Sequence, residues 1–214
     1  MKISDEISRP FIIGLTGTYC AGKNHVARIL EARGFPVLDV DKQGHQAIEM
    51  EKTAILERFG ASILKKDGTI DRRLLGAKVF GKPEELAALE GILHPRVNEL
   101  TELWIHAQQG NPCVINAALL HKSSAFSRLD FIILVKAPAL TRLLRARKRD
   151  RLSWGQIIKR FGSQKEFNTQ YLRKNADIYT VYNKGPGVLR SCFFRPKVEQ
   201  QIDRILFLKG IPQV

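Results

Sequence analysis

The chain of 214 residues is long enough to bury a substantial core, and 44% of its residues are hydrophobic, as in ordinary globular proteins. No apolar stretch approaches the ~20 residues that a membrane helix needs, and residues 1–6 lack the apolar segment of a secretory signal. The formal net charge of +14 raises the question of a polyanionic partner. Three widely spaced cysteines suit neither a disulfide framework nor a zinc cluster, so we expect a cytoplasmic protein with no membrane partner.

The first ten residues are expected to be a loose extension that ends at Pro10. Residues 17–24 read Gly-Thr-Tyr-Cys-Ala-Gly-Lys-Asn, after an apolar run at 11–15 and before apolar residues with helical spacing at 26–30. Strand, glycine-flanked loop, lysine and helix together predict a phosphate-binding loop. An ordinary glycine-rich turn between a strand and a helix is the alternative interpretation.

Each residue type in this loop has a physical role in binding phosphate. Gly17 and Gly22 allow a tight turn with the N–H groups facing inward, at the positive end of the new helix. Lys23 would reach the outer phosphates. The pattern normally closes with Ser or Thr, whose hydroxyl ligates Mg²⁺, whereas this chain has Asn24, whose amide oxygen can also ligate a hard cation.

A second strand is predicted at residues 35–38, after a helix that ends at Gly34. It runs directly into Asp39-Val40-Asp41. In an open parallel sheet, ligands gather at the carboxyl ends of the strands, so we expect both acids near the phosphate loop. The alternation of strand and helix predicts a parallel α/β sheet.

Residues 42–110 carry mainly helical signals and predict a helical insertion that holds a second substrate. The expected helices are 43–58, 72–79 with Asp71 as N-cap, one that begins at Pro83, and 97–109 after an interruption at His94-Pro95. The apolar stripe expected on the last of these helices consists of Leu100, Leu103 and Trp104.

Further strands are predicted at residues 113–116, 131–135 and 178–182, and a final helix at 196–208 with Val198, Ile202, Ile205 and Leu206 facing the sheet. Between them, residues 139–147 begin a basic helical segment, and Ser153 is a candidate N-cap for another helix. Residues 142–174 contain eleven basic and only two acidic side chains, well over half of the net charge. Such a segment suits a lid over phosphates, a polyanion-binding face or a solvated helix face.

The order and spacing of these motifs resemble the dephospho-CoA kinases of coenzyme A biosynthesis. The residues that carry the resemblance are 14–17, 22–23, 37–42, 67–73, 93–95, 119–120, 149–150, 152–153, 176–177 and 183. It implies a P-loop NTPase-type three-layer α/β fold with a five-stranded parallel sheet. Residues 1–41 and 111–214 would form the nucleotide-binding core, with a basic helical lid at about 139–175, and residues 42–110 the insertion that binds the acceptor.

The resemblance also implies a reaction, in which the γ-phosphate of ATP passes to the ribose 3′-hydroxyl of dephospho-CoA to give CoA and ADP, with Mg²⁺ as cofactor. The implied ATP-binding residues are Gly17, Cys20, Ala21, Gly22, Lys23, Asn24, His25, Arg145 and Asn183. The implied acceptor-binding residues are Asp39, Asp41, Asp71, Arg72, His94, Pro95 and Leu119.

Three residues are the candidates for catalysis. Asp41 would accept or orient the proton of the hydroxyl, Lys23 would hold the outer phosphates, and Arg149 would close over the transferring phosphate. Asn24 and Asp39 are the candidate metal ligands. Asp41 as a simple helix cap and Arg149 as a solvated side chain are the alternatives, and the division of roles between Asp39 and Asp41 stays open.

The chain departs from the family pattern at several positions of these sites. In the loop these are Thr18, Cys20, Ala21 and Asn24, and after the third strand Ala118 and Lys122. A thiol beside Lys23 at a helix N-terminus is expected to have a lowered pKa and to react readily. The alternative is an inert small residue at a glycine position.

Two other functions remain open from the sequence. One is another P-loop kinase of nucleotides or nucleosides, and the other is a basic nucleotide-binding protein that is catalytically impaired. The basic segment contains few aromatic residues and no known nucleic-acid motif, so nucleic acid is not expected as a partner. We expect a monomer or a weak homo-oligomer.

Overall fold

The computed structural model describes residues 9–150, 153–162, 177–184 and 196–211. The chain forms two compact units, one of residues 39–107 and the other of residues 1–38 with 108–214. The helical unit begins and ends three residues earlier than the predicted insertion at 42–110. No helix within the described ranges is long and apolar enough to cross a membrane.

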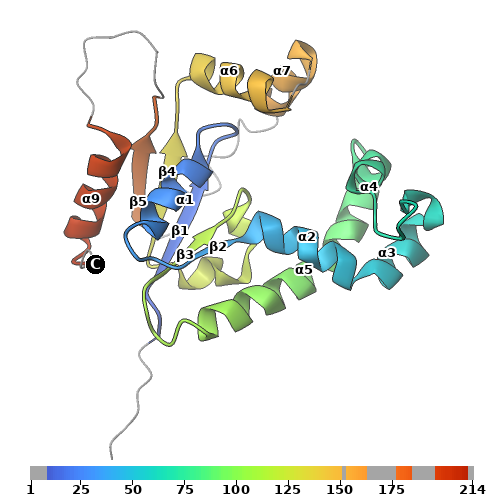
Figure 1. Ribbon diagram of the computed structural model, residues 1–214, viewed down its shortest axis with the longest axis horizontal. Helices are drawn as coiled ribbons and strands as arrows, with labels where there is room; N and C mark the ends of the chain where they lie inside the picture. The colour runs from blue at the N-terminus through green and yellow to red at the C-terminus, as the bar shows by residue number, and fades with distance from the viewer. Residues whose placement is uncertain (1–8, 151–152, 163–176, 185–195, 212–214) are drawn as a thin grey trace, which may run out of the picture. The chain divides into compact units, whose positions relative to one another are not determined.

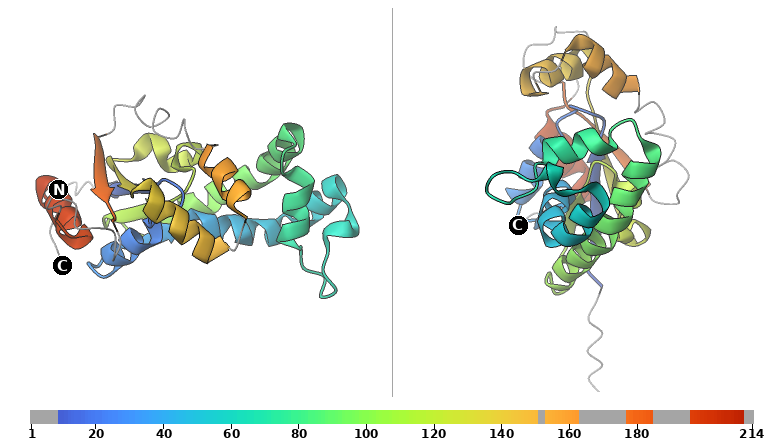
Figure 2. Two further views of the ribbon diagram at one scale, coloured as in Figure 1. Left: turned by 90° about the horizontal axis from the view of Figure 1, so that it is seen from above. Right: turned by 90° about the vertical axis from the view of Figure 1, so that its right-hand side faces the viewer.

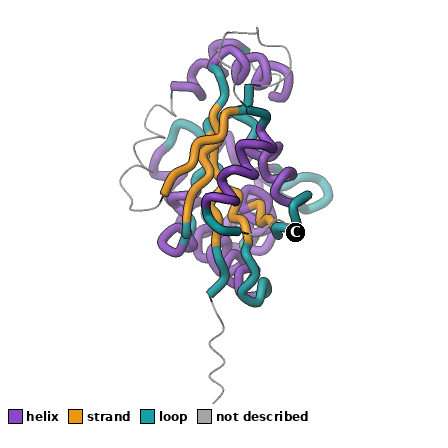
Figure 3. Tube along the Cα trace, turned by 90° about the vertical axis from the view of Figure 1, so that its left-hand side faces the viewer, coloured by secondary structure: helices purple, strands orange, loops and turns teal. Residues whose placement is uncertain are grey.

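The larger unit is built on a five-stranded sheet with the order β2-β3-β1-β4-β5 (Figures 1 and 3). The strands are β1 (Ile12–Gly17), β2 (Val37–Asp39), β3 (Cys113–Asn116), β4 (Phe131–Lys136) and β5 (Asp177–Tyr182). Strand β1 pairs in parallel with β3 and β4, and β4 pairs in parallel with β5. The predicted parallel α/β fold is therefore confirmed, with the second strand starting two residues later than expected.

Strands β1 and β4 are apolar except for Thr16 and the final Lys136, as expected where both faces of the sheet are covered. All six residues of β1 and the first five of β4 are buried. Helices α1 (Lys23–Glu31) and α9 (Val198–Leu208) pack on one face (Figure 1). The expected inner side of α9 is confirmed, since Ile202, Ile205 and Leu206 are buried and Val198 is partly buried.

Beyond the carboxyl end of β4 the chain forms the two basic helices α6 (Ala139–Asp150) and α7 (Trp154–Gly162), drawn in yellow and orange in Figures 1 and 2. The main-chain N–H of Gln156 donates to Ser153 Oγ at 3.4 Å, as expected of an N-cap. Residues 163–175 of the predicted lid lie outside the described residues. Two short 3₁₀ segments, η2 (Leu120–Lys122) and η3 (Ser124–Arg128), connect β3 to β4.

The smaller unit is helical, as predicted for residues 42–110. Its elements are α2 (Val40–Met50), α3 (Lys52–Phe59), η1 (Ala61–Ile63), α4 (Arg72–Val79) and α5 (Pro83–His106). Its core is formed by Ile55, Ile63, Ile70, Leu75 and neighbouring apolar side chains. Two local signals are confirmed: α5 begins at Pro83, and Asp71 Oδ1 accepts from the N–H groups of Arg73 and Leu74 at 2.8 and 3.2 Å.

The single helix predicted at 43–58 is wrong, because the chain breaks at Glu51 between α2 and α3. Glu51 has φ −94° and ψ 21°, and its carboxylate accepts a hydrogen bond from Arg96 Nε of α5 at 2.6 Å. Neither glycine nor proline marks the break in the sequence. A tertiary ion pair accompanies it, which no local pattern reveals.

The interruption predicted at His94-Pro95 is also wrong, because α5 continues through both residues. An internal proline removes one helical hydrogen bond, but packing holds the helix on either side of it. Leu89 lies in the core of the unit, and Thr101 Oγ1 contacts Gln43 Oε1 of α2 at 3.0 Å. Thr101 and Ile105 are the buried residues of the last turns, and Leu103, expected on the inner stripe, is 61% exposed.

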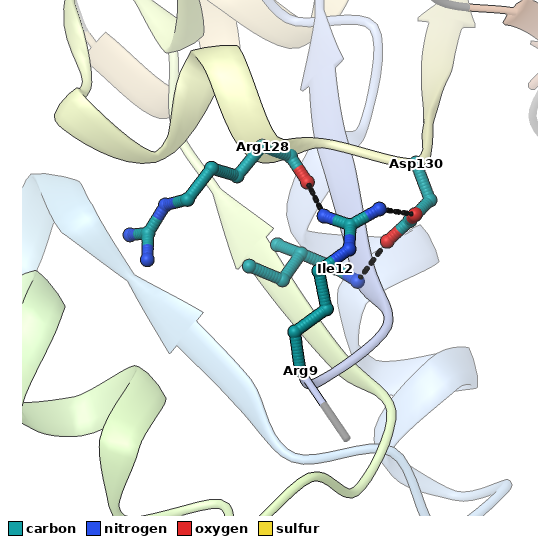
Figure 4. A network of polar contacts seen from close by, with 4 residues as sticks. All are labelled: Arg9, Ile12, Arg128 and Asp130. Carbon is teal, nitrogen blue, oxygen red and sulfur yellow. Dashed lines mark hydrogen bonds and ion pairs between the residues drawn. The ribbon is translucent and has the colours of Figure 1, made fainter. Parts of the chain in front are cut away.

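Polar bonds fix the start of the sheet (Figure 4). Arg9 donates to the carbonyl of Arg128 at 3.0 Å and to Asp130 Oδ1 at 2.5 Å. The main-chain N–H of Ile12 donates to Asp130 Oδ2 at 2.7 Å. Residues 1–8 of the expected loose extension lie outside the described residues, and Arg9 joins the segment before β1 to the segment before β4.

We expect Asp130→Ala to destabilise the protein more than Arg9→Ala. The first change leaves the N–H of Ile12 without its acceptor, which costs about 1–3 kcal/mol of the free energy of unfolding. The second removes an exposed ion pair and an exposed hydrogen bond to the carbonyl of Arg128, and because water can replace both, the loss should be about 1 kcal/mol or less. Urea denaturation of both variants checks the order, and equal losses would show that the hydrogen bond to Ile12 adds nothing.

Candidate functional site

Residues 18–22 form a tight loop between the end of β1 and the start of α1. Gly22 precedes the helix in the left-handed region, with φ 98° and ψ 34°. A Cβ atom at this position would lie 2.2 Å from Asn183 Nδ2. Both the backbone conformation and the available space therefore require glycine at position 22.

Lys23 is the first residue of α1, so its charge adds to the positive end of the helix dipole. The first turn reads Lys-Asn-His, with Asn24 and His25 exposed and Lys23 partly exposed. The free N–H groups of a helix start and a lysine side chain together favour an anion.

Two residues that are distant in sequence bind the carbonyl of Ala21. Arg145 Nη1 of α6 donates to it at 2.9 Å, and Asn183 Nδ2, after β5, donates to it at 3.0 Å. Arg145 Nη2 also donates to Asn183 Oδ1 at 3.1 Å. The structure thus brings Arg145 and Asn183 to the loop that contains Cys20, Ala21 and Gly22. That these residues bind ATP stays a prediction.

Asn116, which the sequence analysis did not single out, faces the loop from the end of β3. Its Nδ2 donates to Asn24 Oδ1 at 3.4 Å. Asn116 is 2% exposed, and its Oδ1 has no hydrogen-bond partner among the described residues. A buried acceptor without a donor is costly, so this oxygen suits a cation or a cation-bound water. The available signal was a polar residue at the carboxyl end of an apolar strand.

The donor set at this position consists of neutral amides. Within the described ranges no group of three His, Cys, Asp or Glu side chains could hold a metal ion. The oxygens of Asn24 and Asn116 are hard ligands of the kind that Mg²⁺ accepts. They fit a Mg²⁺ ion that obtains its negative partners from nucleotide phosphates.

Arg149 lies at the end of α6 beside the phosphate loop. Its Nε donates to Asp150 Oδ1 at 2.6 Å and its Nη2 to Asp150 Oδ2 at 3.1 Å. Its guanidinium carbon lies 5.2 Å from the centre of the Tyr19 ring. The hydrogen bonds to Asp150 raise the pKa of Arg149, so the cation is retained at any working pH.

The expectation of a lowered pKa at Cys20 is wrong. Burial raises the pKa of this thiol, and the nearby charge of Arg149 only partly opposes the effect. Cys20 also has φ 59°, in the left-handed region that favours glycine. This conformation explains why the related pattern has glycine here, and it favours the interpretation of Cys20 as a small, unreactive replacement.

The predicted acceptor-binding acids have different local roles. Asp39 ends β2 and caps α2, where its Oδ1 accepts from the N–H of Lys42 at 3.3 Å. Asp41 lies in the first turn of the same helix. The cap proposed as the alternative role of Asp41 is therefore provided by Asp39.

The remaining predicted acceptor residues belong to both units, Leu119 to the larger unit and the others to the smaller one. Asp71 caps α4, and the N–H groups of Leu74 and Arg73 lower the pKa of its carboxyl. Arg72 is exposed at the start of that helix, and His94 is partly buried beside Pro95 in α5. Leu119, in the larger unit, is 49% exposed just before η2.

A parallel sheet whose central strand leads into a glycine-containing loop, a lysine at the helix start and basic helices over that loop define a P-loop phosphotransferase. A sequence model of the dephospho-CoA kinases matches residues 11–185. The chain belongs to the dephospho-CoA kinase family.

Individual relatives and solved structures are similar to the chain along most of its length. The dephospho-CoA kinase of Treponema pallidum is 36% identical over 210 residues, which cover 94% of this chain and 96% of that protein. A crystal structure of a Thermus thermophilus protein has a TM-score of 0.76 at 28% identity and covers 95% of this chain and 98% of that one. The dephospho-CoA kinase of Campylobacter jejuni shares the fold, with a TM-score of 0.58 at 22% identity over 94% of this chain and 97% of its own.

We expect Cys20 to react more slowly with iodoacetamide at pH 7.5 than free glutathione does. A raised pKa leaves less thiolate at neutral pH, and the reaction should accelerate as the pH rises past the ordinary pKa of a thiol. Mass spectrometry of the peptide that contains Cys20 gives the rate separately from those of the other cysteines. Labelling faster than that of glutathione would restore the reactive-thiol hypothesis.

Proposed function

We propose that the chain transfers the γ-phosphate of ATP to the ribose 3′-hydroxyl of dephospho-CoA, giving CoA and ADP. The observation that carries this proposal is the family match over residues 11–185, which includes the phosphate loop and the basic helix α6. The spacing of the cysteines supports a cytoplasmic location, and we treat the enzyme as a monomer or a weak homo-oligomer.

The phosphate loop and α6 hold and neutralise the transferred group. Lys23 and the N–H groups at the start of α1 bind the β- and γ-phosphates. Arg145 and Asn183 keep the loop in its binding conformation through the carbonyl of Ala21. Arg149 stabilises the charge that spreads over the moving phosphoryl group, which is the main catalytic demand of this chemistry.

The acceptor hydroxyl needs a base or an orienting acceptor, and we assign this role to Asp41. The assignment is supported by the cap of α2, because that cap uses the carboxylate of Asp39. Asp41 follows strand β2 and accepts or orients the proton of the 3′-hydroxyl. Binding of dephospho-CoA is assigned to Asp39, Asp71, Arg72, His94, Pro95 and Leu119.

Asn24 and Asn116 are the residues that would hold Mg²⁺. When bound, the ion would help to neutralise the β- and γ-phosphates. Asp39, the other candidate ligand, already accepts the cap hydrogen bond. Asn24 and Asn116 are uncharged, so the phosphates would provide anionic ligands for the ion.

The test is a product assay by mass spectrometry with ATP, Mg²⁺ and dephospho-CoA, and with AMP, CMP and pantothenate as rival acceptors. CoA formed from dephospho-CoA alone is the expected result. Lys23→Met is the matched control, expected to lower the rate by about 10²-fold because one charged phosphate ligand is lost. Phosphorylation of a rival acceptor would indicate another P-loop kinase, and ATP binding without any product would indicate an impaired binding protein.

We expect Asn116→Asp to lower the Mg²⁺ concentration that gives half-maximal activity by about tenfold or more, because a carboxylate beside Asn24 attracts the cation. Asn111→Asp is the control. It adds the same charge at an exposed position before the other end of β3. Mg²⁺ titration of both variants at fixed ATP checks the prediction, and equal titration curves would exclude Asn116 from the metal site.

A further inference from the structure

Tyr19, in the middle of the phosphate loop, extends its side chain toward α6 and α7. Its hydroxyl donates to Asp150 Oδ2. Its ring meets the ring of Phe161 edge-on, with the centres 5.7 Å apart and the planes at 88°. The guanidinium of Arg149 lies over the same ring, 5.2 Å from its centre. One loop side chain therefore contacts the end of α6 and the end of α7.

The main chain of Tyr19 makes a second connection to the same helices. Arg142 Nε donates to the carbonyl of Tyr19 at 2.8 Å. The guanidinium of Arg142 lies 4.4 Å from the centre of the Phe161 ring. Phe161 is thus held between the loop and α6, and the position of Tyr19 is determined from both its backbone and its ring.

We propose that Tyr19 is a positioning residue for phosphoryl transfer, which acts through Asp150 to fix the guanidinium of Arg149 beside the phosphate loop. The inference rests on the proposed function, since Arg149 is assigned there to the transferring phosphate. Tyr19 itself stays outside the bonds that form and break.

The geometry allows Arg149 to be oriented and still bind phosphate. A guanidinium has five N–H donors, and the pair with Asp150 uses those on Nε and one on Nη2. A phosphate oxygen can be bound by the others while Asp150 holds the plane of the group. The hydroxyl of Tyr19 in turn donates to Asp150. The loop therefore holds Asp150 in place, and Asp150 holds the guanidinium of Arg149. A side chain locked by a second contact loses less freedom when the substrate binds.

Simple packing of an aromatic side chain is the competing explanation, and Tyr19→Phe separates the two. The phenylalanine ring keeps the contacts with Phe161 and Arg149 and loses the hydroxyl, with its hydrogen bonds to Asp150 and to the Cys20 side chain. A positioning role predicts that kcat falls about tenfold, the size of one hydrogen bond to a charged group. The KM values for ATP and dephospho-CoA should change less than about twofold, because the contact with Arg149 matters most in the transition state.

The double variant Tyr19→Phe with Arg149→Ala tests whether the effect passes through the arginine. Its kcat should equal that of Arg149→Ala alone, because the positioned group is absent. Asp150→Asn, which keeps the size of the side chain and removes its charge, should lower kcat and be equally non-additive with Tyr19→Phe. Tyr179→Phe in β5 is the control for loss of a phenol hydroxyl elsewhere in the same unit, and it should leave kcat and KM unchanged.

The outcomes separate this inference from the proposed function. If the unmodified enzyme makes no CoA, the proposed function is wrong. If it makes CoA and Tyr19→Phe has the same kcat, Tyr19 does not position Arg149. An equal loss in the Arg149→Ala background, or a loss confined to KM, would also overturn the inference. A lower kcat with unchanged KM that disappears without Arg149 supports it.

Discussion

The structure of the site depends on the carbonyl of Ala21, which accepts hydrogen bonds from Arg145 and from Asn183. A loop that exposes its N–H groups to phosphate must turn its carbonyls the other way, and those carbonyls need donors of their own. Arg145 comes from the helix after β4, and Asn183 follows β5. The hydrogen bonds therefore make the loop conformation depend on the sheet order, which places β4 beside β1 and β5 beside β4.

The same dependence explains which parts of the fold the sequence could predict. Strand β4 was predictable because a buried parallel strand needs a continuous apolar run, and α4 and α5 because Asp71 and Pro83 act on the backbone next to them. The break at Glu51 was not, because it is accompanied by an ion pair with Arg96, 45 residues away. The interruption predicted at Pro95 was wrong because tertiary packing of α5 overrides a local helix breaker.

The candidate site likewise contains residues that the sequence could predict and residues that it could not. The loop glycines and Lys23 were predictable because their chemistry is contiguous in sequence. Asn116 contacts Asn24 across 92 residues and Tyr19 contacts Asp150 across 131, so neither pair leaves a local pattern. For Arg145, Asn183 and Arg149 the resemblance to dephospho-CoA kinases supplied what spacing alone could not. The pKa of Cys20 was predicted in the wrong direction, because proximity to a lysine in the sequence says nothing of burial.

The residues in and around the loop affect how much positive charge surrounds the phosphates. Transfer of a phosphoryl group from ATP requires several positive partners around the phosphates. In the proposed metal site, Asn24 and Asn116 would offer Mg²⁺ neutral amides, which bind the ion more weakly than carboxylates do. Helix α6 carries five basic residues in twelve, and Tyr19 connects the end of that helix to the loop. A loop of glycines would have no side chain to make this connection. Tyr19 therefore supports the proposal that arginines held close to the phosphates provide much of the positive charge of the site.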